Sequence, residues 1–314
     1  MSVNYDALLR PKTLDEVIGI PKVKRRLRTI ITAYRKQNTR PANILLSGPP
    51  GVGKTLLSHV IANELGVDVT VTTGAEVSDD AWQVQTDMTT GDNVLFIDEI
   101  HQLNKKGQDI LLPWLEQGGF EYTKLSYNMT TRRSTWEKSW KAFTCIGATT
   151  RPDPLQAAFD QRFKLRIFLS LYTEGELGQI AGRSARLLNL FIAPDGLREV
   201  ARRSKGTPRI VNNQLWYIQQ YAIANDIRVL YPGDVDDALN ELGIDQLGLN
   251  DQDRFYLETL ATFDRPTGLR VLADSMMATS DAIRNTEPFL LKSGLVQLSP
   301  RGRILTDKGK QHIT

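Results

Sequence analysis

The chain has 314 residues, of which 41% are hydrophobic and 24% are charged; this composition excludes a disordered chain and predicts two or three folded domains. No apolar run is long enough to cross a membrane, and an N-terminus without an apolar segment predicts no secretory signal. The net charge is only +3, so any DNA-binding surface has to be local. The single cysteine, Cys145, lies in an apolar run and is expected to be a small buried side chain, and a cytoplasmic location is expected.

Residues 1–169 alternate short apolar runs with longer helical stretches, which is the pattern of a parallel α/β sheet. A helix over residues 55–65 is expected to end at Gly66, because glycine favours helix C-termini. The expected buried strands are 42–48, 68–74, 93–98 and 143–150.

The segment GPPGVGKT, residues 48–55, has the spacing of a phosphate-binding loop. Its glycines let backbone N–H groups turn toward phosphate oxygens, and the strand before it and the helix after it place a helix N-terminus at the phosphates. In such a loop Lys54 reaches the β and γ phosphates, and the hydroxyl of Thr55 binds Mg²⁺. The sequence therefore predicts a nucleoside-triphosphate site.

The segment FIDE, residues 96–99, supplies two carboxylates at the end of a buried strand. Asp98 can hold Mg²⁺ through water, and Glu99 can orient and deprotonate an attacking water. A protein that only binds nucleotide does not need Glu99, so hydrolysis is predicted. His101 has no second metal ligand nearby and is expected to be structural or part of a polar relay.

Four further residues are candidates for sensing the γ-phosphate, although each also has an ordinary structural interpretation. A hydroxyl of Thr149 or Thr150 could contact the phosphate or the attacking water, or it could cap a turn. Arg162 could reach the phosphate of a neighbouring subunit, or it could be a solvated surface residue. Arg209, at the start of a helix, could bridge the helical block to the phosphate, or it could be structural.

Residues 119–142 interrupt the α/β pattern and are expected to form a β-hairpin with its tip near Met129–Arg133, the alternative being an exposed loop. The segment is rich in aromatic side chains and carries arginines at its tip, which is typical of interfaces and favours docking of a partner. The alternative is that its tryptophans only pack the hairpin onto the domain.

The rest of the chain is predicted to form a helical block and a smaller C-terminal unit. Short helices are expected at 251–263, 267–275 and 279–291, before two apolar runs that flank the basic tip in LVQLSPRGRILT. Helices followed by a basic β-wing suggest a winged helix, and the cationic residues favour contact with DNA phosphates over a merely solvated face.

With these motifs the chain resembles the RuvB family, the AAA+ ATPases that drive branch migration of Holliday junctions. The resemblance extends over all three blocks. The matching segments are LRPKTLDEVIG (9–19), LLSGPPGVGKTLL (45–57), ANELGV (62–67), LFIDEIHQL (95–103), IGATTRP (146–152), RSARLL (183–188), EVARRSKGTPRIVN (199–212), EPFLLKSGL (287–295) and SPRGRILT (299–306).

The resemblance implies an α/β fold: an AAA+ P-loop ATPase domain with a parallel sheet (1–169, with the hairpin inserted at about 119–142), an all-helical lid domain (170–243) and a C-terminal winged-helix DNA-binding domain (244–314). It implies ATP and Mg²⁺ as cofactors, and duplex DNA or DNA junctions as the partner of a homo-oligomeric ring, expected to be a hexamer.

The resemblance also implies a role for individual residues. The catalytic set is Glu99, Lys54, Thr150 as sensor 1, Arg162 as arginine finger and Arg209 as sensor 2. The nucleotide contacts are Gly48, Pro49, Pro50, Gly51, Val52, Gly53, Lys54, Thr55, Leu56 and Arg209, with Ile18 and Tyr172 at the adenine. The metal ligands are Thr55 and Asp98, and the DNA contacts are Arg301 and Arg303.

Several segments depart from the family pattern. The chain has FDQRFKL where the family often has LRDRFG, and Val17 replaces an aromatic residue beside the adenine. NQLWYIQQY stands where the family has an arginine-rich helix (RLLRRVRD-like), so this face has lost its positive charge. The hairpin is also unlike the family's, whose apolar surface binds RuvA, so its partner is expected to be a RuvA-like or a replication protein.

The sequence therefore predicts an ATP-driven DNA translocase. A first alternative is a clamp- or helicase-loader-type switch that hydrolyses ATP once per loading event. A second alternative is a DNA-binding adaptor whose ATPase only controls assembly. Processive, DNA-stimulated turnover would separate the motor from the loader, and full biological activity of a Glu99→Gln variant would indicate the adaptor.

Overall fold

The computed structural model describes residues 5–37, 39–90, 93–128, 133–151 and 155–313. The chain divides into two compact units. One unit comprises Arg10–Gly48 and Gly53–Ser170, and the other comprises Met1–Leu9, Pro49–Val52 and Leu171–Thr314.

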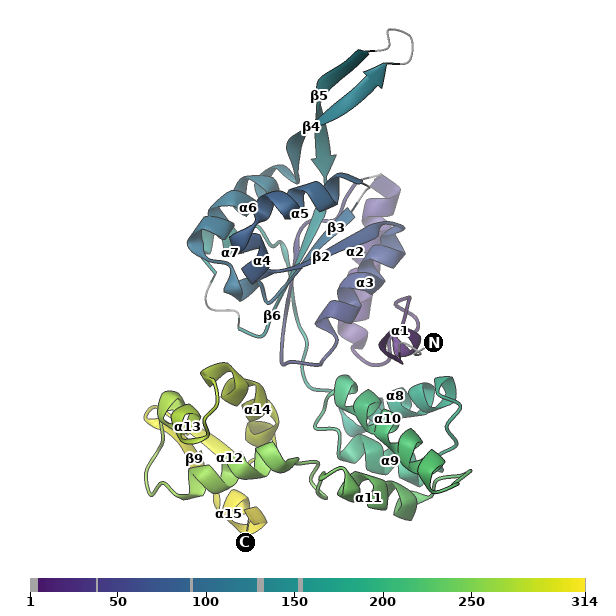
Figure 1. The fold of residues 1–314 in the computed structure, drawn as a ribbon, viewed down its shortest axis with the longest axis vertical. Helices are drawn as coiled ribbons and strands as arrows, with labels where there is room; N and C mark the ends of the chain where they lie inside the picture. Colours follow the sequence, from purple (N-terminus) through teal and green to yellow (C-terminus); the bar gives the residue numbers. More distant parts are fainter. Residues whose placement is uncertain (1–4, 38, 91–92, 129–132, 152–154, 314) are drawn as a thin grey trace. The chain divides into compact units, whose positions relative to one another are not determined.

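The first unit is built on a parallel five-stranded sheet in the order β2-β3-β6-β1-β7 (Figure 1). The four expected strands are confirmed, with ends that shift by one or two residues. The edge strand β7 was not predicted, because the charged Arg166 and the exposed Phe168 interrupt its apolar pattern. The strands are β1 Ile44–Ser47, β2 Asp68–Thr73, β3 Asn93–Asp98, β6 Thr144–Thr149 and β7 Leu165–Phe168.

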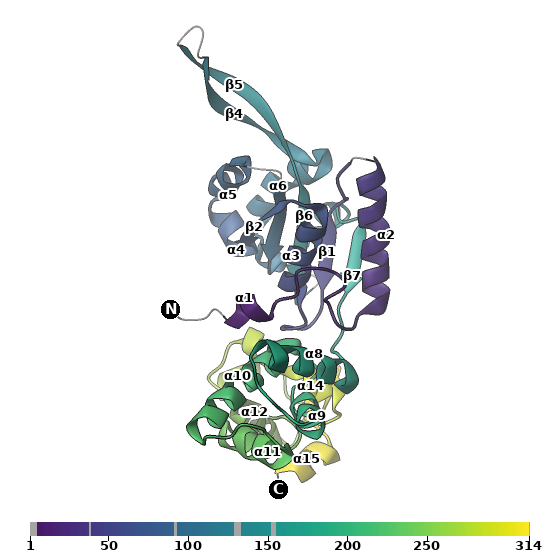
Figure 2. The same ribbon diagram turned by 90° about the vertical axis from the view of Figure 1, so that its right-hand side faces the viewer.

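Helices cover both faces of this sheet (Figures 1 and 2). Leu95, Ile97 and Cys145 lie in one buried cluster with side chains from α4, α5 and α6, and the prediction that Cys145 is buried is confirmed. Successive strand residues point to opposite faces, so Phe96 faces the other side, where α3 contacts β2, β3 and β6. The helices are α2 Pro21–Gln37, α3 Lys54–Leu65, α4 Gly74–Asp79, α5 Ala81–Asp87, α6 Lys105–Gln117 and α7 Ala157–Asp160, with short 3-10 turns η1 Met88–Thr90 and η2 Ile100–Gln102.

The predicted hairpin is confirmed, as β4 Gly119–Asn128 pairs antiparallel with β5 Arg133–Ala142 and extends away from the sheet in both views (Figures 1 and 2). Its expected tip includes residues 129–132, which lie outside the described residues. At its base, Phe120 is buried beside Trp114 and Phe143, with ring centroids 4.8 and 6.0 Å away. Phe120, one of the aromatic residues that made the segment 119–142 a candidate docking element, therefore belongs to the core of the unit and is not open to a partner.

The second unit begins with a helical domain, as predicted. Its helices are α8 Glu174–Leu187, α9 Pro194–Arg202, α10 Pro208–Ala224 and α11 Pro232–Glu241, and the short helix α1 Tyr5–Leu9 contacts α8. The fully buried guanidinium of Arg203 forms ion pairs with Glu199 and Asp236 and donates to the carbonyl of Ile244 at 3.2 Å. Because a buried charge is tolerated only when it is paired and hydrogen-bonded, Arg203 ties α9 to α11 and to the residues after α11.

The same unit ends in a small domain of helices and one β-hairpin, with its own core cluster around Tyr256, Leu257 and Leu290. The expected basic hairpin is confirmed, because β8 pairs antiparallel with β9, but the last helix was not predicted. The elements are α12 Asp251–Ala261, α13 Leu269–Ser275, α14 Ser280–Lys292, β8 Val296–Ser299, β9 Gly302–Leu305 and α15 Asp307–Ile313. Among the helices that the structure describes, none combines the length and the apolar character that crossing a membrane requires.

Candidate active site

The strand order brings three chemistry-bearing segments together at the carboxyl ends of β3, β6 and β1. Ser47 of β1 is level with Thr149 of β6, and Ile97 of β3 is level with Gly147. Since parallel strands end at the same edge, the phosphate loop, the Asp98-Glu99 pair and Thr150 follow neighbouring strands. Ligands of open α/β sheets bind at this kind of edge.

The phosphate loop connects β1 to α3 through backbone conformations that glycine adopts easily. Gly53, the residue just before α3, has a φ of 100°, and Gly48 has a φ of 147°. A Cβ at Gly48 would lie 2.1 Å from the carbonyl oxygen of Leu169, so no other residue fits there. Gly53 offers no capping side chain, which leaves the first N–H groups of α3 for another acceptor, as a phosphate requires.

Lys54 and Thr55 open α3 with their side chains held by polar groups of the same unit. Lys54 is buried, and its Nζ donates to the carbonyl of Gly48 at 2.8 Å. The Thr55 hydroxyl donates to Oδ2 of Asp98 at 3.2 Å, while Oδ1 of Asp98 accepts the N–H of Glu99 at 2.9 Å. The two predicted metal ligands therefore meet in one place, and the pair of oxygens suits a hard cation such as Mg²⁺.

Glu99 is the most constrained carboxylate of the site. Its backbone has a φ of 44° and a ψ of 49°, a left-handed conformation that non-glycine residues adopt at a cost. Its Oε2 accepts the hydroxyl of Thr150 at 3.2 Å and lies 3.0 Å from Nδ1 of His101. The carboxylate that we expect to activate water is therefore held from two sides.

His101 completes a polar relay beneath Glu99. Thr149 is fully buried, and its hydroxyl donates to the carbonyl of Arg151 at 2.6 Å and accepts the N–H of Arg151 at 2.8 Å. With its only proton used, this hydroxyl can only accept from Nδ1 of His101, which is 3.0 Å away. The proton of His101 therefore sits on Nδ1, where it faces both Thr149 and Glu99.

Arg162 lies outside this cluster. Its guanidinium forms an ion pair with Glu116 of α6, and its backbone carbonyl accepts from the side-chain amide of Asn43 at 3.3 Å. About a third of the Arg162 side chain is exposed, with a relative accessibility of 37%. Its guanidinium is therefore within reach of solvent rather than committed to the Glu99 relay.

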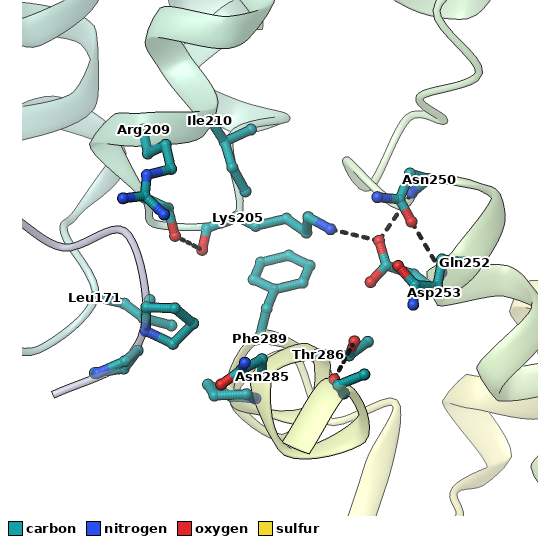
Figure 3. A pocket seen from close by; sticks show the side chains of 15 residues that line it. Leu171, Lys205, Arg209, Ile210, Asn250, Gln252, Asp253, Asn285, Thr286 and Phe289 are labelled. Carbon is teal, nitrogen blue, oxygen red and sulfur yellow. Dashed lines mark hydrogen bonds and ion pairs between the residues drawn. The ribbon is translucent and has the colours of Figure 1, made fainter. Parts of the chain in front are cut away.

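Arg209 stands at the start of α10 in the second unit. Its N–H donates to the carbonyl of Gly51 at 3.4 Å, and both residues belong to this unit. Its side chain lines a cavity of about 340 Å³, together with Lys205 of the lid and Asn250 and Phe289 of the C-terminal domain (Figure 3). Lys205 and Asp253 form a largely buried ion pair at this cavity, which links the loop before α10 to α12.

The two expected adenine contacts lie in different units. Ile18 is half-buried in the loop before α2, next to the buried Val17. Tyr172 is buried in the second unit, and its N–H donates to the carbonyl of Gly206 at 2.8 Å. Burial, followed by the negative charge of Glu176, raises the pKa of Tyr172 to about 12, so its phenol stays neutral.

The two arginines of the wing differ in their surroundings. Arg301, at the turn between β8 and β9, is exposed. Arg303 points into the domain, where Nε and Nη2 donate to the carboxylate of Glu287 at 2.6 and 3.1 Å. The hydrogen bonds from Arg303 to Glu287 raise the pKa of Arg303, and Tyr256 donates its hydroxyl to the same carboxylate at 3.1 Å. Arg303 therefore fastens β9 to α14 and α12.

A parallel sheet with a phosphate loop, a paired Asp-Glu motif and a separate helical lid defines a P-loop ATPase of the AAA+ class. Comparison with known proteins narrows the class. The family model described as the Holliday junction DNA helicase RuvB P-loop domain matches residues 9–169, the RuvB AAA lid domain matches residues 172–245, and the RuvB C-terminal winged helix domain matches residues 246–314. The chain belongs to the RuvB family.

Individual relatives agree over nearly the whole length. The RuvB subunit of the Holliday junction branch migration complex from Kosmotoga olearia is 39% identical over 310 residues, which cover 97% of this chain and 90% of the relative. The corresponding subunit from Chloroflexus aurantiacus is 38% identical over 312 residues, covering 97% and 87%. The solved structure of the RuvB branch migration motor of Thermotoga maritima is similar with a TM-score of 0.87 and 33% identity, and 98% of each chain is covered.

Glu287 is a functional candidate that the motifs did not single out, whereas His101 was expected to be structural or part of a polar relay. His101 has a weak signal in the sequence, since it lies two residues after Glu99. Glu287 has none, because its role depends on Arg303, 16 residues further along, and on Tyr256 in another helix.

Proposed function

We propose that the protein is an ATP-driven motor that moves duplex DNA through a branch point, working as a homo-oligomeric ring. The observation that carries the proposal is the arrangement around Glu99, whose carboxylate is held by Thr150 and His101 next to the Thr55–Asp98 pair. Such an arrangement is needed for hydrolysis and not for binding alone. The similarity to RuvB subunits over 97% of the chain supports DNA branch migration as the process that ATP hydrolysis drives.

The phosphate loop and the metal-ligand pair fit ATP and Mg²⁺. The loop from Gly48 to Gly53 would cradle the phosphates with its N–H groups, and Lys54 would neutralise their charge. Thr55 and Asp98 would hold the metal ion, which supplies charge neutralisation at the phosphates. Ile18 and Tyr172 would contact the adenine, and Arg209 would contact the γ-phosphate.

Glu99 would orient the attacking water and accept its proton. The hydroxyl of Thr150, which donates to Glu99, and the imidazole of His101, which lies 3.0 Å from the same oxygen, would fix the carboxylate in one orientation. Thr150 would also report the state of the γ-phosphate to Glu99, since a hydroxyl that turns to the phosphate releases the carboxylate.

Arg162 would act on the site of a neighbouring copy. It is partly exposed and is held by Glu116, so it can be presented at a surface without entering the pocket of its own chain. A cation that stabilises the transferred phosphoryl group from a second subunit makes hydrolysis depend on assembly. This arrangement would couple the subunits of the proposed ring, which we expect to be a hexamer.

The C-terminal domain would hold the DNA backbone. The exposed Arg301 is the residue that we expect to contact phosphate, while Arg303 would keep the wing in place through Glu287. Phosphate contact makes binding dependent on salt and nearly independent of sequence, as a translocating motor requires.

The hairpin would dock a partner protein of the RuvA type or a replication protein. Trp136 and Trp140 are 72% and 50% exposed along β5, so a large part of each ring is open to a partner. Exposed tryptophans are favoured anchors of interfaces, and the hairpin connects α6 to β6, the strand that ends at Thr149. A partner bound to β4 and β5 would therefore be linked to the catalytic edge.

A four-way DNA junction with one labelled arm tests the proposal. The protein, with its partner where one is needed, is expected to convert the junction to duplex products with ATP and not with a non-hydrolysable analogue, over many turnovers per ring. A loader-type switch would hydrolyse about one round of ATP per DNA molecule and leave the junction intact, which would contradict the motor.

A further inference from the structure

Helix α2 is a strongly basic surface on the ATPase unit. It has 17 residues and no acidic one, whereas the whole chain has a net charge of only +3. Leu27 and Ile31 point into the core. The basic residues are Lys22, Lys24, Arg25, Arg26, Arg28, Arg35 and Lys36.

Part of this charge has no counter-charge in the described part of the chain. Arg28 pairs with Asp15, and Arg35 pairs with Glu64. Among the described residues, no carboxylate forms an ion pair with Lys22, Arg25 or Arg26, and all three are exposed. Their spacing places them on one side of the helix, so the first turns of α2 present a cationic patch to solvent.

The lid carries a surface of the opposite charge on α10 and α11. Trp216 is 46% exposed, and the hydroxyl of Tyr217 donates to Glu241 at 2.8 Å. The pKa of Tyr221 is raised, first by desolvation and then by the negative charges of Asp237 and Glu241. These two carboxylates therefore lie near the aromatic side chains of α10. Among the described residues, no cation forms an ion pair with Asp237 or Glu241. We call Trp216, Tyr217, Tyr221, Asp237 and Glu241 the acidic lid face.

We infer that the acidic lid face of one copy of the chain binds the basic face of α2 on a second copy. The lid face carries its carboxylates on α11 and its aromatic side chains on α10, so it can oppose the cationic first turns of α2. Opposite charges set the register, and the aromatic side chains of α10 cover the aliphatic stems of the arginines. This inference rests on the proposed assembly of a ring and assigns the surfaces that build it.

The second copy fits this surface better than other occupants. The lid face repels nucleic acid because it is acidic, and it exposes aromatic rings that need an apolar neighbour. The same chain supplies a matching cationic face in every copy, so each subunit can use its lid for one neighbour and its α2 for the next. Such a head-to-tail interface closes into a ring.

Two charge-reversed variants test the pairing. One carries Arg25→Glu and Arg26→Glu, and the other carries Asp237→Lys and Glu241→Lys. Each alone is expected to raise the protein concentration needed for assembly with ATP and Mg²⁺ by roughly tenfold or more, as measured by mass photometry or analytical ultracentrifugation. An equimolar mixture is expected to restore assembly, because each reversed face then meets a reversed partner. Lys105→Glu with Lys106→Glu, an equal change at exposed positions of α6, serves as the control.

Thermal unfolding of each variant shows whether the fold is kept. Normal assembly of either folded variant, or a mixture of folded variants that fails to assemble, would overturn the pairing. Loss of DNA binding in the α2 variant with normal assembly would instead assign that helix to DNA. A wild-type chain that stays monomeric would also refute the inference. A wild-type chain that assembles but does not move junctions would refute only the proposed function.

Discussion

The catalytic edge of the sheet and the C-terminal wing hold their charged side chains in different ways. At the edge, the carboxylate of Glu99 lies between Thr150, which follows β6, and His101, which lies in the turn after the neighbouring strand β3. In the wing, Arg303 is fixed by a single buried carboxylate, whereas Arg301, two residues away, is exposed.

The difference between the catalytic edge and the wing shows how much a sequence motif specifies about its side chains. The phosphate loop and FIDE are local patterns whose chemistry requires each residue to face the same ligand. The wing motif places two arginines on one short hairpin, but their roles depend on the neighbours that the fold supplies. A match to a basic motif therefore identifies a region that can bind DNA. The burial of each arginine side chain then determines which of them is available to contact DNA.

The largest expected effect concerns Arg162. It would show that the catalytic edge of one chain is incomplete without a residue from a neighbouring chain. Arg162→Ala is expected to lower ATP turnover of assembled protein by roughly 10³-fold or more, because a cation that stabilises the transition state is lost. Adding Lys54→Ala subunits is expected to restore some turnover in mixed assemblies. Arg166→Ala, nearby and more exposed, is the control. No recovery at any ratio, with mixed assemblies demonstrated, would speak against a shared site.

The buried ion pair of the wing gives the next effect. Arg303→Ala is expected to lower the free energy of unfolding by roughly 3–5 kcal/mol, because Glu287 stays buried without its partner. Arg301→Ala is expected to change it by less than about 0.5 kcal/mol, as for an exposed residue. Chemical denaturation of the three proteins measures both values. Equal effects of the two substitutions would remove the distinction between the wing arginines.

Substitution of His101 tests whether this side chain positions Glu99 at the catalytic edge. His101→Ala is expected to lower kcat by roughly 10- to 100-fold with KM nearly unchanged, because Glu99 loses the imidazole that lies 3.0 Å from its carboxylate and restricts its orientation. Gln102→Ala, at the exposed next position, is expected to leave kcat unchanged. Steady-state kinetics on assembled protein separates the two constants. A rise in KM alone would mean that His101 supports binding rather than the position of Glu99.

The smallest effect concerns the exposed arginine of the wing. Arg301→Ala is expected to lower the slope of log affinity against log salt concentration by about one unit, equally for unrelated duplexes, because one phosphate contact is lost. Arg198→Ala, an exposed arginine of the lid, is the control. Binding titrations at several salt concentrations give the slope. A loss confined to one DNA sequence would indicate base contacts instead.

Much of the fold could be predicted because its signals are local. Apolar runs gave four of the five strands, and Gly66 ends α3 as expected, with a φ of 70° and N–H contacts to the carbonyls of Ala62 and Asn63. The strand β7 was missed because four residues with one charge carry too little periodicity. Its pairing with β1 is a long-range contact that no local pattern encodes.

The candidate site was predictable where the chemistry fixes the spacing. Lys54, Thr55, Asp98 and Glu99 come from two contiguous motifs, and their side chains meet because β1 and β3 flank β6. The proton on Nδ1 of His101 could not be predicted, since it follows from the two hydrogen bonds that Thr149 makes with Arg151. The burial of Arg303 likewise depends on helices α12 and α14.

A single-turnover experiment with Glu99→Gln tests the central claim, that hydrolysis at Glu99 drives the movement of DNA. The variant, bound to a four-way junction, is expected to retain labelled ATP in stoichiometric amount and to hydrolyse it at least about 10²-fold more slowly than wild type, because only the proton acceptor is removed. The junction is expected to stay in place over the same time. Hydrolysis at the wild-type rate, or junction movement while the ATP remains intact, would contradict the account.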